Sequence, residues 1–342
     1  MVPIGIPILI IREKKVVEID NTILYLSHED VISTGIGPAE AFETAEEVLL
    51  EHSKKYYQNP PKPSLYLSEH DFIDAMPAYL PGLNAVGIKW LSAFSSNHKR
   101  GLRPIQGLII LNDVTTGQPV TIMDCGYITA LRTAAVSAVA AKYLSDPKSA
   151  VMGIIGAGTQ ARAHLQALKR VLKKIECIKV YDINEVAAHR FASTMGEGES
   201  FQVKPVGSAE MAIRDSDVVL TATGNLMGKP PIFMEKWLKR GSHIIPVHNY
   251  GWEWSALMHA DKLVVDDYQQ YSTTFHIDSY NPHLPPCYSE LSAIVAGLKK
   301  GRERNDEVIV SLHAGIALQD IALATKVYAA AKANDIGKRL LF

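Results

Sequence analysis

The chain has 342 residues, and its 35 Lys and Arg against 36 Asp and Glu give a formal net charge of −1 at pH 7. A chain of this length exceeds what one hydrophobic core usually fills, so two domains are expected. The balanced charge, with neither a basic stripe nor an acidic tail, argues against nucleic acid and anionic membrane surfaces as partners.

Three cysteines, Cys125, Cys177 and Cys287, lack metal-ligand spacing. They predict packing thiols in a reducing compartment, and no metal site is expected. The amino-terminal run MVPIGIPILIIREKKVVEID has no basic residue before its apolar part, and prolines interrupt it. It is therefore not interpreted as a signal peptide, and a cytoplasmic location without membrane spans is expected.

The first 125 or so residues consist mostly of short apolar runs separated by turn signals such as TTG and PPKP. The runs read as strands are VVEI, LYLS, VGIKWLSAF, GLIILND and QPVTIMD. One strong helical pattern, AEAFETAEEVLLEHSKKYY, has apolar residues at three- and four-residue spacing. This part is predicted to form an α+β unit.

From residue 129 the pattern changes to a helix of small residues, TALRTAAVSAVAAKYL, followed by alternating apolar runs and helical or turn segments. Such alternation predicts an α/β fold with a parallel, doubly wound sheet of the Rossmann type. Near the end, SLHAGIALQDIALATKVYAAAKAND is interpreted as one long helix that can return to the first domain.

The stretch VMGIIGAGTQARAHL carries the dinucleotide fingerprint G-x-G-x-x-A between an apolar run and a helix. The first glycine permits a tight turn, the second lets the backbone approach the pyrophosphate, and the alanine keeps helix and strand close. The predicted cofactor-binding residues of this turn are Gly156, Gly158, Thr159, Gln160 and Ala161.

Asp182, in KVYDIN, follows the fingerprint by about 20 residues, where a carboxylate binds the ribose hydroxyls. Its charge would repel a 2′-phosphate, so NAD is favoured over NADP. Thr221, Ala222 and Thr223, in TATGN, come at the end of a later apolar run and are assigned to the cofactor as well. For the two threonines, β-propensity by itself is an equally good explanation.

Three cations stand in apolar or stiffened surroundings. Lys89 is the only charge in LNAVGIKWLSAF, Arg132 lies on the helix of small residues, and Lys62 follows two prolines in PPKPSLYL. A buried lysine needs an anion, and an arginine fork with ammonium groups suits a carboxylate. Spacing does not establish that the three converge, and Lys89 could instead extend to water from a strand end.

The chain resembles the ornithine cyclodeaminase/mu-crystallin family. The blocks that carry the resemblance are MPAYL, GIKW, GLIILNDVTTGQPVTIMD, ITALRTAAVSAVAAKYL, GIIGAGTQARAH, VYD, DVVLTAT, ELSAIVAGLKKGR and GIALQD. The resemblance implies a Rossmann NAD-binding domain, here 129–317, and a discontinuous substrate-binding domain, here 1–128 plus 318–342, closed by the C-terminal helix. It also implies a homodimer formed through that second domain.

The resemblance further implies hydride transfer between the nicotinamide and the α-carbon of an amino acid or its imine. It implies that Lys89, Arg132 and Lys62 bind the substrate α-carboxylate, although many members have arginine at the position of Lys62. Lys89 is also the expected catalytic residue. Met76 is added to the substrate site, and Arg132 and Thr133 to the cofactor site.

One block departs from the family. Cyclodeaminases hold the distal amine of ornithine with an aspartate in a Gly-Ala-Asp block, and IIPVHNYGWEW places Tyr250 at that position. A phenol carries no charge at neutral pH, which argues against ornithine cyclodeamination unless His248 or Glu253 substitutes. General acids other than Lys89 stay unranked among Asp320, Tyr250 and His313.

Three functions remain open. The first is an NAD-dependent amino acid dehydrogenase or imine reductase. The second is ornithine cyclodeaminase, which converts ornithine to proline and ammonia. The third is a non-catalytic NAD(P)H-binding accessory protein, for which the carboxylate-binding cations would be unnecessary.

Overall fold

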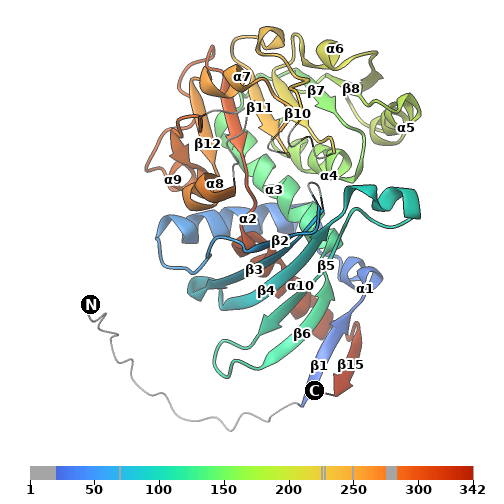
Figure 1. The fold of residues 1–342 in the computed structure, drawn as a ribbon, viewed down its shortest axis with the longest axis vertical. Coiled ribbons are helices and arrows are strands. Elements are labelled where there is room, and N and C mark those ends of the chain that lie inside the picture. Colours follow the sequence, from blue (N-terminus) through green and yellow to red (C-terminus); the bar gives the residue numbers. More distant parts are fainter. Residues whose placement is uncertain are drawn as a thin grey trace.

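The computed structural model describes residues 21–341 except 69–70, 225, 227–228, 249 and 275–282. The amino-terminal apolar run and the expected strand VVEI lie outside the described residues. The described part forms two sheets, one above the other along the long axis of the molecule (Figure 1). We call them the mixed sheet and the parallel sheet.

The mixed sheet has seven described strands in the order β15-β1-β6-β5-β4-β3-β2. The five strands from β2 to β6 pair antiparallel with one another in sequence order, while β1 is parallel to β6 and antiparallel to β15. The strands are β1 (Thr22–Leu26), β2 (Ser64–Tyr66), β3 (Phe72–Leu80), β4 (Ala85–Ala93), β5 (Ile105–Asn112), β6 (Pro119–Asp124) and β15 (Lys338–Leu341). The helical segments near it are α1 (His28–Ser33), α2 (Pro38–Ser53), η1 (Pro81–Leu83), η2 (Ser95–Arg100) and α10 (Ala317–Ala333).

β4 shows how the sequence builds this sheet. Its residues are alternately buried and more exposed, as expected of a strand with one face on a core. The buried face packs against α10, which also contacts β3 and β5. Lys89 belongs to this buried face, whereas its neighbour Trp90 points to the other side and is 45% exposed.

The parallel sheet has eight described strands in the order β13-β12-β14-β11-β10-β7-β8-β9, all paired in parallel. The predicted doubly wound Rossmann-type sheet is therefore confirmed. The strands are β7 (Val151–Ile155), β8 (Cys177–Tyr181), β9 (Gln202–Pro205), β10 (Val218–Thr221), β11 (His243–Pro246), β12 (Lys262–Val265), β13 (Ser289–Glu290) and β14 (Ile309–Leu312). The helical segments are α3 (Gly126–Leu144), α4 (Thr159–Leu168), α5 (Glu185–Gly196), α6 (Ala209–Ile213), η3 (Glu235–Trp237), α7 (Trp254–Met258), α8 (Tyr268–Thr274) and α9 (Leu291–Val295).

The order of the parallel strands reverses between β7 and β10, and ligands of such sheets bind outside the carboxyl ends of the strands at this point. α3 connects the two sheets and packs against both α2 and α4. Its many alanines allow these close contacts. The domain boundaries at 128/129 and 317/318 stay predictions.

The prediction of one long helix from SLHAG onward is wrong at its start. Residues 309–312 form β14, and α10 begins only at Ala317. Gly315 between them has φ +82°, a backbone conformation that interrupts a right-handed helix. The later part of the expectation is right, because α10 does return to the mixed sheet.

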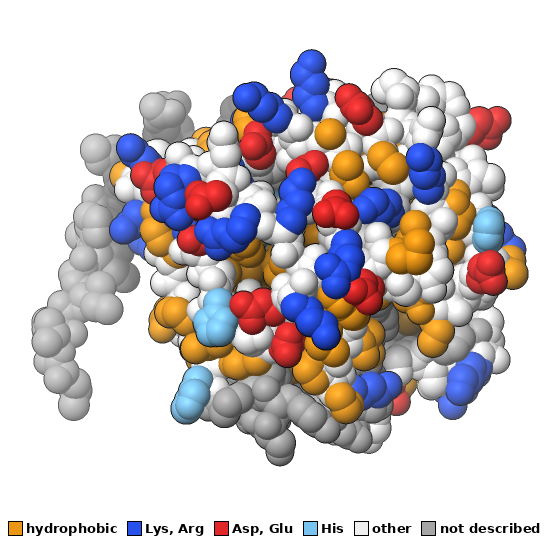
Figure 2. Space-filling view, turned by 90° about the horizontal axis from the view of Figure 1, so that it is seen from above, with side chains coloured by type: hydrophobic (Ala, Val, Ile, Leu, Met, Phe, Trp, Pro, Cys, Tyr) orange, Lys and Arg blue, Asp and Glu red, His pale blue; other side chains and the backbone are white. Residues whose placement is uncertain are grey.

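No helix of the described residues is both long and apolar enough to cross a membrane. Figure 2 shows the molecule from above, where Lys and Arg side chains alternate with Asp and Glu side chains over this face. Positive and negative charges are therefore also balanced locally on this face.

Candidate functional site

The glycine-rich turn directly follows β7. Gly156 has φ +95°, and a Cβ added to it would lie 2.3 Å from the carbonyl oxygen of Ala222. Gly158 is the N-cap of α4, and a Cβ there would meet no atom within 4 Å. Ala161 has no exposed surface and packs in the core. The first glycine thus closes the turn, and the second leaves open space beside the helix N-terminus for an anionic group.

Asp182 follows β8 and is held beside this turn. Its Oδ2 accepts a hydrogen bond from the backbone N–H of Ala157 at 2.8 Å, and its Oδ1 accepts one from Asn184 at 2.8 Å. Each carboxylate oxygen keeps a lone pair for another donor, such as a ribose hydroxyl. Its role in binding a ribose of the dinucleotide stays a prediction.

Two buried polar atoms near the turn have no hydrogen-bond partner among the described residues. They are Oε1 of Gln160 in the first turn of α4 and Oγ1 of Thr223 after β10. Buried polar atoms without partners are costly and call for a ligand or water. Together with Gly158 and Asp182, they fit a bound dinucleotide.

Two further threonines assigned to the cofactor, Thr221 and Thr133, have partners within the protein. Oγ1 of Thr221 accepts a hydrogen bond from the indole N–H of Trp252 at 3.2 Å. Oγ1 of Thr133 donates to the carbonyl oxygen of Thr129 at 2.6 Å. Their place at the cofactor stays a prediction.

The anion beside Lys89 is a carboxylate of the protein itself. Nζ of Lys89 lies 2.8 Å from Oδ1 of Asp320, and Nε of Arg132 lies 3.1 Å from the same oxygen. The side chains of Lys89 and Asp320 are 0% exposed, and that of Arg132 is 11% exposed. Oδ2 of Asp320 is buried and has no partner among the described residues. We call this group the Lys89–Asp320–Arg132 cluster.

Burial controls the electrostatics of the cluster. It lowers the pKa of Lys89 to about 8, with a contribution from the charge of Arg132, although Asp320 opposes the shift. Burial tends to raise the pKa of Asp320, but the charges of Arg132 and Lys89 outweigh it and hold the pKa below its usual value. Asp320 is therefore a carboxylate at neutral pH. The pKa of Lys89, about 8, lies close to neutral pH.

Two further predicted substrate residues, Met76 and Lys62, lie near Lys89. Met76 is on the same face of the mixed sheet, and Lys62 is at the edge of the sheet, just before β2. Met76 on β3 is 3% exposed and is the cross-strand neighbour of Lys89. Lys62 precedes β2, and its Nζ donates to the carbonyl oxygen of Ala314 at 2.7 Å, in the turn between β14 and α10. Burial lowers the pKa of Lys62. Both ammonium groups and the guanidinium thus meet residues of one segment, 314–320.

The region of the missing family aspartate follows β11. Tyr250 is half-buried there, and Asn249 lies outside the described residues. Burial lowers the pKa of His248 to about 4, so its ring is neutral at pH 7. Oε2 of Glu253 accepts a hydrogen bond from the backbone N–H of Glu235 at 2.9 Å. The neutral ring of His248 offers no negative charge to a distal ammonium, and one carboxylate oxygen of Glu253 is already bound to the backbone.

Sequence reasoning did not recognise Asp320 as the partner of Lys89, although it stood among the unranked acids. The signal was present, since Asp320 is the one charge in GIALQDIALA. His313, another of those acids, is half-buried, and its Nε2 has no partner among the described residues. Burial lowers the pKa of His313.

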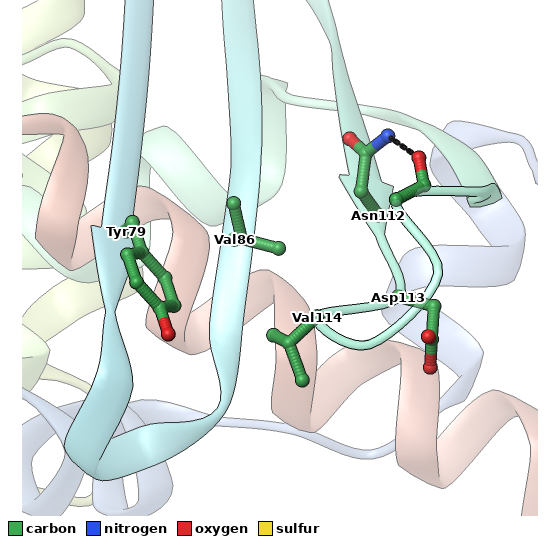
Figure 3. Close-up of a pocket in the computed structure, with 6 residues that line it drawn as sticks. Tyr79, Val86, Asn112, Asp113 and Val114 are labelled. Atoms are coloured by element: carbon green, nitrogen blue, oxygen red, sulfur yellow. Dashed lines mark hydrogen bonds between the residues drawn. The ribbon is translucent and has the colours of Figure 1, made fainter. Parts of the chain in front are cut away.

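A cavity of about 390 Å³ lies elsewhere, on the face of the mixed sheet opposite Lys89 (Figure 3). Tyr79 and Val86 line it from β3 and β4, and Val114 from the β5–β6 hairpin. Nδ2 of Asn112 donates to the carbonyl oxygen of Gly117 at 2.8 Å and closes the hairpin. None of the described residues that line the cavity is a cation that could bind a carboxylate, and the cavity is separate from the site described above.

Comparison with known proteins agrees with this geometry. The family model for the ornithine cyclodeaminase/mu-crystallin family matches residues 26–335. The alanine dehydrogenase of Archaeoglobus fulgidus is 35% identical over 328 residues, covering 93% of this chain and 98% of that protein. The structure of Thermococcus litoralis Delta(1)-pyrroline-2-carboxylate reductase in complex with NADH and L-proline has a TM-score of 0.83 and 33% identity, covering 93% of this chain and all of that one.

A structure of an archaeal alanine dehydrogenase dimer with bound NAD has a TM-score of 0.82 and 32% identity, and it covers 94% of this chain and 99% of that one. The two solved structures hold NADH and NAD respectively, in agreement with the cofactor expected from Asp182. Because the family model spans most of the chain and these relatives match it almost from end to end, the protein belongs to the ornithine cyclodeaminase/mu-crystallin family, as predicted.

Proposed function

We propose that the protein is an NAD-dependent oxidoreductase that transfers hydride between the nicotinamide and the α-carbon of a small amino acid or its imine. The observation that carries the proposal is the Lys89–Asp320–Arg132 cluster. One carboxylate oxygen is shared by two cations, while the other is buried without a partner among the described residues.

This arrangement suits both polar groups of an amino acid. The guanidinium of Arg132 uses only Nε for Asp320, so its remaining N–H groups can bind the substrate carboxylate, with Lys62 as a second cation. Oδ2 of Asp320 can accept the N–H of the substrate amine or iminium, which would satisfy that oxygen. The two contacts together fix the α-carbon.

The dinucleotide would be held by the turn at Gly156 and Gly158, by the N-terminus of α4 and by Asp182. When bound, NADH supplies the hydride and NAD accepts it. The protein contributes orientation, because a fixed α-carbon beside the cofactor removes most of the entropy cost of the reaction.

Lys89 and Asp320 exchange the proton that accompanies hydride transfer. In reduction, the protonated Lys89–Asp320 pair keeps the imine nitrogen protonated, which makes its carbon accept hydride. In oxidation, the deprotonated pair takes a proton from the substrate ammonium. A lysine with a pKa near 8 can do both close to neutral pH.

The substrate side chain is small or apolar in this proposal. The family resemblance places Tyr250 where cyclodeaminases carry an aspartate, and a phenol is a weaker partner for a terminal ammonium than a carboxylate. Alanine and proline, or their imines, need no negative charge at that position. A cyclodeaminase acting on ornithine does need one.

We expect the purified protein to oxidise NADH when offered pyruvate with ammonium or Δ1-pyrroline-2-carboxylate. NADPH should be used at least about tenfold less efficiently, because Asp182 repels a 2′-phosphate. The measurement is NADH absorbance, followed by NAD reduction with L-alanine, L-proline and L-ornithine. No change in NADH absorbance with any of these substrates would contradict the proposal. Release of proline and ammonia from ornithine would favour the cyclodeaminase instead.

We also propose that the protein forms a homodimer through the outer face of the mixed sheet. Cross-strand neighbours on this face form a continuous apolar row from β3 to β1: Pro77, Ile88, Ile110, Ile122 and Tyr25. Trp90 and Leu108 beside the row are 45% and 42% exposed. α10 lies behind this sheet (Figure 1) and covers its other face. An apolar surface of this extent is typical of a protein interface.

Ile110→Asp is expected to convert the dimer to a monomer, because it would bury an unpaired charge in the middle of the row. Light scattering after size-exclusion chromatography measures the mass directly. Leu298→Asp is the matched control, since Leu298 is 70% exposed and follows α9 in the other domain. A wild-type mass of about 37.5 kDa, the mass of one chain, would contradict the dimer.

A further inference from the structure

The position of Lys62 depends on a turn that belongs to the other domain. Lys62 lies between α2 and β2, and its ammonium donates to the carbonyl oxygen of Ala314, which follows β14 of the parallel sheet. The site therefore needs the 313–315 turn in one place relative to the mixed sheet. A shift of this turn would move the ammonium with it.

A buried carboxylate holds the turn. Asp266 follows β12 and is 2% exposed. Its Oδ1 accepts hydrogen bonds from the backbone N–H groups of Ala314 and Asp267, both at 3.0 Å, and its Oδ2 accepts one from Gly315 at 2.8 Å. Both oxygens are thus used to bind backbone N–H groups of neighbouring segments.

The same turn also packs against the guanidinium of Arg132. A Cβ added to Gly315 would lie 3.2 Å from Nη1 of Arg132, so the backbone passes directly beside the guanidinium. Gly315 also has φ +82°, which glycine adopts without steric strain but is equally free to leave, so a fixed turn here gains from external support. Asp266 supplies that support through the N–H of Gly315.

The residues after Asp266 fasten the segment around Lys62 as well. Asp267 Oδ2 lies 3.0 Å from Nε2 of His52 near the end of α2, and the amide of Gln270 donates to the carbonyl oxygen of Pro60 at 3.0 Å. The 266–270 segment thus contacts both the turn that receives Lys62 and the chain that carries Lys62. The 266–270 segment therefore fixes both partners of the hydrogen bond between Lys62 and Ala314.

We propose that Asp266 is a positioning residue that places Lys62 and Arg132 for the substrate carboxylate by holding the 313–315 turn. This inference rests on the proposed function for the identity of the ligand. Asp266 itself touches neither the substrate nor the cofactor. Its role is distinct from that of Asp320, which contacts the two cations Lys89 and Arg132 directly.

The charges around Lys62 make the proposal measurable. Burial lowers the pKa of Lys62, as does Arg132, while Asp74 on β3, Asp266 and Asp320 on α10 raise it. Asp266→Asn removes one negative charge and leaves an amide group that can accept hydrogen bonds through one oxygen only. Lys62 should then lose its proton at a lower pH than in the wild type.

The test uses Asp266→Asn with Asp261→Asn as its matched control. Asp261 precedes β12 and accepts the N–H of Val308, just before β14, at 2.8 Å, so it links the same two strands at their opposite ends. We expect Asp266→Asn to raise KM for the imino acid by at least about tenfold, with a smaller change in kcat and unchanged NADH affinity by fluorescence titration. Asp261→Asn should lower the melting temperature similarly and leave KM unchanged.

A second readout needs no turnover. Trace acetylation of Lys62, followed by mass spectrometry across pH, should give a lower midpoint in Asp266→Asn than in the wild type and the control. Unchanged KM and an unchanged acetylation midpoint in Asp266→Asn would overturn the proposal. An inactive wild type would contradict the proposed function, but the acetylation midpoint would still test this inference. If Asp266→Asn does not fold, Asp266→Glu replaces it, since it keeps the charge but displaces the turn and should raise KM with a midpoint near that of the wild type.

Discussion

Asp320→Asn is expected to lower kcat/KM for imine reduction by about a thousandfold or more, as the loss of a proton-exchanging group usually does. The amide cannot carry the negative charge that both Lys89 and Arg132 face in the wild type. It also offers the substrate nitrogen a weaker acceptor. NADH titration by fluorescence should show that the cofactor still binds, and kcat/KM is measured from NADH absorbance.

The same change should destabilise the protein, because two buried cations would lose their counter-charge. Breaking one partner of a buried ion pair costs about 3–5 kcal/mol, which chemical denaturation can measure. Asp320→Asn combined with Lys89→Met removes both charges of the pair and should recover part of that stability but none of the activity. An active single variant would contradict the role of Asp320, and an active double variant would contradict that of the pair.

The pH dependence of kcat/KM should run in opposite directions for the two reactions. Burial lowers the pKa of Lys89 to about 8. Reduction needs the protonated pair, so its kcat/KM should fall tenfold per pH unit once the pH rises above about 8. Oxidation needs the deprotonated pair, so its kcat/KM should rise with pH up to about 8 and then level off.

Initial rates with NADH and an imino acid, and with NAD and the matching amino acid, measure both profiles between pH 6 and 10. Lys89→Arg provides the comparison, since a guanidinium stays charged throughout this range. Its reductive profile should lose the fall near pH 8, and its oxidative activity should be small. Parallel profiles in the two directions would contradict proton exchange by Lys89.

The sequence by itself was sufficient for the parallel sheet and the dinucleotide turn, because both depend on local patterns. The fingerprint around Gly156 and Gly158 uses conformations and contacts within a strand, a turn and a helix that follow one another in the chain. Asp182 comes at a fixed separation from it. Such features need no knowledge of distant residues.

The start of the last helix could not be predicted in the same way. The small and apolar residues around Ser311 suit a helix or a buried strand equally well. The parallel sheet decided for a strand, because β14 pairs with both β11 and β12 and buries all four of its residues. Gly315 then permits the turn that precedes α10.

The site shows the same division between local pattern and tertiary contact. Lys89, Arg132 and Asp320 each stand as the lone charge in a local apolar stretch, and burial requires each to find a partner. The sequence therefore indicated that partners exist, and the family resemblance suggested a substrate carboxylate. Only the tertiary structure shows that Asp320 is the partner of both cations, since it lies 231 and 188 residues from them in the chain. Packing of α10 against β3, β4 and β5 brings these charges together, and no periodicity along one element can encode that contact.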